Sequence, residues 1–63
     1  MSWDDVKRYL EERGHYLTQE EFYWLCLATS AKIVKNIDYV DYNLVSIVTI
    51  DGIGWNFRVK KQL

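Results

Sequence analysis

Residues 17–34, LTQEEFYWLCLATSAKIV, constrain the fold most, because they have the pattern of one long helix with apolar side chains on two sides. Thr18 is suited to the N-cap position, since its hydroxyl can accept the Glu21 amide while the Glu21 carboxylate accepts the amide of Thr18. Leu17 and Phe22 flank this capping box as a hydrophobic staple. The pattern therefore predicts a helix from residue 18 to about residue 34.

Two apolar stripes follow this predicted helix when successive residues are placed about 100° apart. The stripe expected in the core comprises Phe22, Leu25, Cys26, Thr29 and Ile33. The opposite stripe comprises Trp24, Leu27 and Ala31. A helix that is apolar on two sides has to be covered on two sides. The rest of the chain supplies one cover, and a partner is expected to supply the other.

A shorter helix is predicted before it, over residues 3–13. Ser2 is suited to the N-cap, and Asp4 and Asp5 lie in the first turn, where the helix dipole favours negative charge. Gly14 follows at the position where helices often end. The apolar side of this helix comprises Trp3, Val6, Tyr9 and Leu10. The connection to the longer helix is short, so the two helices are expected to be antiparallel neighbours.

The C-terminal half has the pattern of a β-hairpin. Residues 43–50 are apolar and β-branched, residues 51 and 52 are the strong turn signal Asp-Gly, and residues 53–61 alternate between apolar and polar. A two-residue loop would place Val48 opposite Trp55 and turn both side chains toward the helices. The reverse face would then hold Val45, Ile47 and Thr49.

These elements predict one α+β domain over residues 1–63 in the order α-α-β-β, with two N-terminal helices packed on one face of a C-terminal antiparallel β-hairpin. Residues 35–38 are expected to form a helix end and a turn. Residues 39–42 form either a loop or a short third strand, and both alternatives stay open. A two-stranded ribbon is marginal alone, so the helices, a third strand or a second chain must support it.

Composition excludes several classes of function. Hydrophobic residues make up 49% of the chain and the net charge is −1, which argues against disorder and against a typical nucleic-acid binder. One Cys and one His provide neither a disulfide nor the usual four zinc ligands. Cys26 is expected in the core rather than at a reactive site. We therefore expect no enzymatic activity, no cofactor, no metal, no membrane span and a cytoplasmic location.

One resemblance concerns DNA binding. Residues 17–37, LTQEEFYWLCLATSAKIVKNI, resemble the helix-turn-helix of small repressors and excisionase-type regulators, and residues 54–63, GWNFRVKKQL, resemble the strand that closes a wing in such proteins. The resemblance implies a recognition helix that begins near Thr29 and enters the major groove. The nucleic-acid contacts of this alternative would come from Ser30, Lys32, Lys35, Arg58 and Lys60.

The preferred hypothesis is a non-enzymatic binding protein that acts by protein–protein contact, as an inhibitor or an adaptor. Ten aromatic residues, 16% of the chain, exceed what so small a core usually holds, and Trp, Tyr and Arg are the residues that anchor interfaces. Small phage proteins are similar in size and composition. The expected interface comprises Trp24, Leu27, Ala31, Val45, Ile47 and Arg58. The same apolar patch predicts either a homodimer or a site for another protein.

Overall fold

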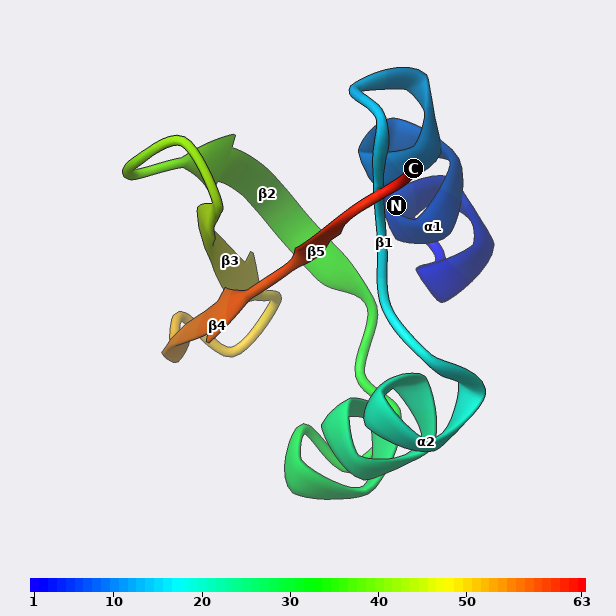
Figure 1. The fold of residues 1–63 in the computed structure, drawn as a ribbon. Coiled ribbons are helices and arrows are strands. Elements are labelled where there is room, and N and C mark those ends of the chain that lie inside the picture. Colours follow the sequence, from blue (N-terminus) through cyan, green and yellow to red (C-terminus); the bar gives the residue numbers. More distant parts are fainter.

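A computed structural model describes residues 1–63. The elements in chain order are α1 (Trp3–Glu12), β1 (His15–Tyr16), α2 (Gln19–Ala28), β2 (Val34–Tyr39), β3 (Leu44–Thr49), β4 (Gly54–Arg58) and β5 (Lys60–Lys61). The long strands form an antiparallel sheet in the order β2-β3-β4, and β1 pairs with β5 in a second, two-stranded sheet. Both chain termini lie beside α1, whereas α2 lies apart at the opposite end of the molecule (Figure 1).

The predicted α-α-β-β order with a single hairpin is wrong. The chain forms five strands in two sheets, and β1 lies between the two helices. A third strand does join the hairpin, but it occupies Val34–Tyr39, where the prediction had a helix end and a turn, rather than residues 39–42. Val34 and Ile37 are buried on this strand. The β-branched side chains of Val34 and Ile37 fit a pleated surface better than a helix.

The first helix forms as predicted, with one residue less at its end. Ser2 is the N-cap, where its hydroxyl accepts the Asp5 amide at 3.3 Å and the Asp5 carboxylate accepts the Ser2 amide at 3.0 Å. Val6 and Leu10 point from α1 into the core and are fully buried. Gly14 follows the helix with φ +75°, the left-handed conformation that glycine adopts at low cost.

The second helix begins as predicted and ends six residues early. The capping box is present, with Thr18 Oγ1 accepting the Glu21 amide at 3.2 Å and Glu21 Oε1 accepting the Thr18 amide at 2.8 Å. The helix ends at Ala28, and Ser30 and Ala31 adopt φ 58° and 55°. The expected stripe therefore does not continue to residue 33, because that residue no longer belongs to the helix.

The hairpin register differs from the predicted one by one residue. Ile47, not Val48, lies opposite Trp55. The loop contains three residues rather than two, because the Thr49 amide donates to the Ile53 carbonyl at 3.0 Å and Gly52 adopts φ +86°. A turn followed by a left-handed glycine is the usual geometry of three-residue hairpin loops. A shift of one residue exchanges the two faces of a strand. The inner and outer faces of β3 are therefore the reverse of those predicted, whereas Trp55 and Phe57 of β4 remain on the inner face as predicted.

The core lies between α1 and the sheet. Its buried apolar side chains are Val6, Leu10, Leu17, Val34, Ile37, Val45, Ile47 and Val59. None of them comes from α2. The expectation that both helices pack on one face of the sheet is therefore wrong for the second helix, which contacts the core only through half-buried side chains such as Phe22 and Leu25.

The loop geometry predicts a difference between two glycines of the same hairpin. Gly52→Ala forces a side chain into the left-handed region and is expected to lower the free energy of unfolding by about 1 to 2 kcal/mol. Gly54→Ala is the matched control, because Gly54 has no positive φ and an added Cβ would lie 4.0 Å from the nearest carbonyl oxygen, that of Ile47. Urea denaturation of both variants measures the difference. Equal stability of the two variants would contradict the three-residue loop.

Candidate functional site

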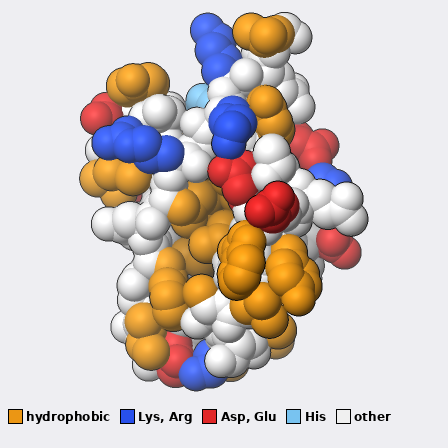
Figure 2. All heavy atoms as spheres, turned by 60° about the horizontal axis from the view of Figure 1, so that its bottom comes forward, with side chains coloured by type: hydrophobic (Ala, Val, Ile, Leu, Met, Phe, Trp, Pro, Cys, Tyr) orange, Lys and Arg blue, Asp and Glu red, His pale blue; other side chains and the backbone are white.

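The outer face of α2 carries the main exposed apolar surface of the helical part. Tyr23 and Trp24 are each 60% exposed and Leu27 is 52% exposed. The two rings meet edge to face, with centroids 5.9 Å apart. Leu27 lies one helical turn beyond them, because residues three and four apart are neighbours on a helix. Figure 2 turns the α2 end forward and shows hydrophobic side chains gathered there. We call Tyr23, Trp24 and Leu27 the aromatic face of α2.

The helix stands away from the rest of the chain. No Cα atom of α2 lies within 8 Å of a Cα atom in another helix or strand. Its first turn is held by an ion pair in which Lys60 Nζ lies 2.8 Å from Glu21 Oε2. Lys60, together with the Thr18 amide, lowers the pKa of Glu21. Its end is held by the buried Thr29, whose hydroxyl donates to the Leu25 carbonyl at 2.8 Å. Between these ends the helix contacts the core through the half-buried Phe22 and Leu25.

A cleft of about 530 Å³ lies between α1 and α2. Its lining residues are Trp3, Asp4, Lys7, Leu17, Gln19, Phe22 and Cys26. Cys26 is half-buried at this cleft, so its expected place in the closed core is wrong. The helix stands too far from α1 for its side chains to fill the space between them. The Trp3 indole is fixed in the cleft wall, because its Nε1 donates to the Lys32 carbonyl at 3.1 Å.

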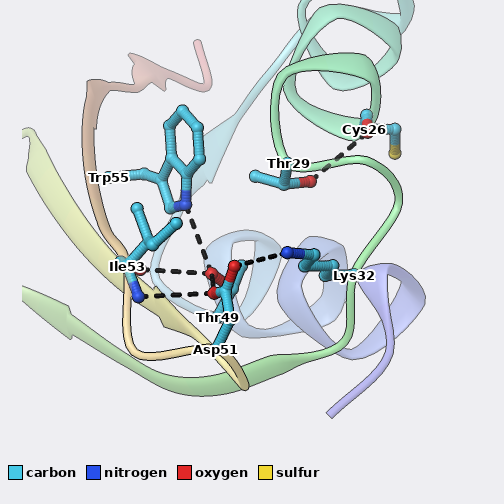
Figure 3. A network of polar contacts seen from close by, with 7 residues as sticks. All are labelled: Cys26, Thr29, Lys32, Thr49, Asp51, Ile53 and Trp55. Carbon is cyan, nitrogen blue, oxygen red and sulfur yellow. Dashed lines mark hydrogen bonds and ion pairs between the residues drawn. The ribbon is translucent and has the colours of Figure 1, made fainter.

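A polar network joins the end of the α2 segment to the hairpin loop (Figure 3). Lys32 pairs with one carboxylate oxygen of Asp51, and the Thr49 hydroxyl donates to the other. Trp55 Nε1 lies 3.4 Å from the same hydroxyl, which is buried. The Lys32 ammonium and the Thr49 hydroxyl lower the pKa of Asp51 from 3.8 to about 2. The network therefore connects two segments that are 19 residues apart in the chain.

The predicted interface residues separate into two groups. Trp24, Leu27 and Ala31 are exposed as expected. Val45 and Ile47 are fully buried, because the register turns them toward α1. Arg58 is exposed, but its guanidinium donates to Asn43 Oδ1 at 2.8 Å. The structure thus keeps only Trp24 and Leu27 together on one helix, because Ala31 lies beyond the end of α2, and it adds Tyr23 to them.

The residues of the DNA-binding alternative do not form a recognition helix. No helix begins near Thr29, since the chain enters β2 at Val34. Ser30 and Lys35 are exposed, whereas Lys32 and Lys60 are paired with carboxylates of this same chain. The arrangement that the helix-turn-helix resemblance implied is therefore wrong for this segment.

Among the remaining titratable groups, His15 and Tyr39 contact each other. His15 Nδ1 lies 2.6 Å from the Tyr39 hydroxyl, and burial raises the pKa of Tyr39. No three side chains of His, Cys, Asp or Glu gather where they could share a metal ion. Neither helix has the length and apolar character that crossing a membrane requires.

Comparison of the chain with family models, curated proteins and solved structures finds no match.

The cleft and the polar network are the parts of this surface that the sequence patterns did not indicate. The network has a local signal, because Asp51 precedes a turn glycine and such carboxylates often accept nearby donors. Its partner Lys32 has no local signal. The cleft depends on the distance between two helices, which no pattern within either helix specifies.

The network predicts a specific loss of stability in acid. Because the pKa of Asp51 is lowered by folding, its ionised form stabilises the folded state above its ordinary pKa of 3.8, and this contribution disappears as the pH falls toward about 2. Asp51→Asn is expected to be less stable than the wild type at neutral pH, with the gap closing in acid. Urea midpoints at neutral pH, near pH 4 and near pH 2 measure the gap. Asp38→Asn is the control, because Asp38 forms no ion pair. A gap that does not change with pH would contradict this role of Asp51.

Proposed function

We propose that this protein acts by binding another protein through the aromatic face of α2, as an inhibitor or an adaptor rather than as an enzyme. The observation that carries the proposal is the exposure of Tyr23, Trp24 and Leu27 on a helix that fully buries none of its own side chains. A helix held in this way contributes little to the core of the chain. Its apolar residues are instead available to a partner.

The residue types suit an interface. Trp and Tyr are enriched among the residues that dominate binding energy, and each buries roughly 150 to 250 Å² when covered. Trp24 and Leu27 are three residues apart, and Tyr23 and Leu27 are four apart, which is the spacing of helical anchors that enter a groove. A partner with an apolar groove is therefore the chemical match for this face.

The cleft extends the same surface. Along the helix circumference Cys26 faces the cleft, and Tyr23 follows on the side of the aromatic face, at about 100° per residue. A partner that covers Tyr23 can also place an apolar side chain between Trp3 and Phe22, which line the cleft. This larger footprint approaches the roughly 800 Å² per partner of a standard interface more closely than three side chains alone.

The charge arrangement favours a protein partner over a nucleic acid. Phosphate binding needs cations that are free to replace counterions, but Lys32 and Lys60 are already paired with Asp51 and Glu21. Residues 1–31 also contain three Lys or Arg against six Asp or Glu. A single cysteine without a disulfide suits a reducing compartment, so we place this activity in the cytoplasm.

The proposal predicts which substitutions abolish binding. Trp24→Ala combined with Leu27→Asp is expected to remove capture of a specific protein from a nuclease-treated cell lysate, with at least about a tenfold loss of affinity for that protein once it is purified. The fold should remain intact, because both side chains are more than half exposed. Circular dichroism and urea denaturation check the fold.

Tyr42→Ala is the matched control. Tyr42 is an aromatic residue that is 78% exposed, and it lies in the β2–β3 connection away from α2. This variant should capture the same protein as the wild type. Equal capture by all three proteins, or capture that depends on nucleic acid, would refute the proposed function.

A further inference from the structure

The outer edge of β4 has no strand beside it. β4 is the last strand of the order β2-β3-β4. The Val59 amide donates to the Asn43 carbonyl at 2.9 Å and the Ile53 carbonyl accepts the Thr49 amide at 3.0 Å. Backbone groups of alternate residues in an antiparallel strand point to opposite edges. The amides and carbonyls of Gly54 and Asn56 therefore point away from β3, toward the free edge.

The chain already uses this same edge a few residues further on. Lys60 pairs with Tyr16 of β1, and the Gln62 amide donates to the Gly14 carbonyl at 2.8 Å. Lys60 and Gln62 are an even number of residues from Gly54 and Asn56, so their backbone groups point to the same edge. After Tyr16 the chain leaves the edge to form α2, so the stretch along β4 remains open.

The opposite edge of the sheet is covered at its beginning. Val34 at the start of β2 exchanges two backbone hydrogen bonds with Met1, since the Met1 amino group donates to the Val34 carbonyl and the Val34 amide donates to the Met1 carbonyl. An irregularity in the register between Val34 and Asn36 further interrupts that edge. Such bulges are one way in which edge strands avoid pairing with other chains.

The β4 edge lacks these protections. Gly54 and Asn56 are exposed and uncharged, and the strand contains neither a proline nor a lysine. Arg58 is its only charge, and the hydrogen bond to Asn43 directs that side chain over β3 rather than over the edge. On the inner face, Trp55 and Phe57 are half-buried and Ile53 is 49% exposed, so an apolar row runs along the same edge.

We propose that two copies of this chain associate by pairing β4 with β4 in antiparallel orientation, about a two-fold axis at Trp55. Gly54 of each copy then lies opposite Asn56 of the other, and these residues exchange about four backbone hydrogen bonds. Trp55 faces its own counterpart, and Ile53 faces Phe57. The two three-stranded sheets become one continuous sheet.

The position of the two-fold axis at Trp55 follows from the length of the open edge, which ends where β1 begins. β1 occupies it at Lys60, so a second strand that extends farther along the edge would bring its hairpin loop against β1. With the axis at Trp55 the loop of the second copy ends beside Arg58. The two Arg58 side chains lie at opposite ends of the paired segment, so no like charges face each other. The cross-strand neighbours on the inner face are aromatic or β-branched, which are favourable pairs.

Amide hydrogen exchange and sedimentation, both measured at protein concentrations from about 1 µM to about 1 mM, test the pairing. A small interface dissociates in this range. The amides of Gly54 and Asn56 should become protected as the dimer fraction rises. The amides of Trp55 and Phe57, which are already bonded to β3, should be protected at every concentration. A chain that stays monomeric throughout, or a dimer whose Gly54 and Asn56 amides exchange freely, would overturn the proposal.

A pair of double variants tests the register. Gly54→Lys with Asn56→Lys places like charges opposite each other twice and should abolish dimerisation. Gly54→Lys with Asn56→Glu places opposite charges there and should keep the dimer at low salt. Both positions are exposed, and a side chain at residue 54 has room. Identical sedimentation of the two variants would refute the register.

Two further variants keep the result interpretable if the lysine variant fails to fold. Asn56→Pro removes only an amide that points to the open edge, and an edge strand tolerates proline at such a position, so this variant should be a folded monomer. Asn56→Thr keeps the amide and should form the dimer. Trp24→Ala with Leu27→Asp should leave the dimer unchanged. Loss of the dimer in this last variant would assign association to α2 and refute the β4 edge, independently of whether α2 binds another protein.

Discussion

The left-handed glycine in the hairpin loop is the constraint on which the rest of the structure depends. Gly52 at φ +86° allows a three-residue loop, and this loop sets which residues of β3 lie opposite β4. Val45 and Ile47 consequently face inward and meet Val6 and Leu10 of α1 in the core. With a loop one residue shorter, the same strand would present Ser46 to the core instead.

The loop also determines where the helical part ends. Asp51, which directly precedes this glycine, holds Lys32, and Lys32 follows the two left-handed residues that end the α2 segment. The Lys32 carbonyl accepts the indole of Trp3, so the same position also connects to α1. Three elements therefore meet at one residue. The body of α2 takes no part in this junction, and its aromatic face stays open.

Short sequence patterns predicted the helix starts, because a helix cap depends only on neighbouring residues. The Thr18 capping box, the Ser2 N-cap and the start of each helix follow from side chains within four residues of one another, and all are present. The structure also shows a capping box between Ser2 and Asp5, which was not predicted. The end of α2 and the length of the hairpin loop had no such local signal. Asp51-Gly52 fits loops of two or three residues equally well, because both loops place the glycine in the left-handed region. At the candidate site, exposure of Trp24 and Leu27 was predictable because it follows from helical spacing.

The same reasoning explains why the sheet offers an edge rather than a face. Each inward residue of β3 is covered by α1 or by neighbouring strands, so the predicted patch of Val45 and Ile47 does not exist at the surface. What the short chain cannot cover is the last strand, because the residues that could have formed a fourth strand beside β4 are used to build α2. The length of β1, two residues, is thus the reason that both an exposed helix face and an open strand edge occur in one small chain. Extending β1 would close the edge but would consume the first turn of the helix.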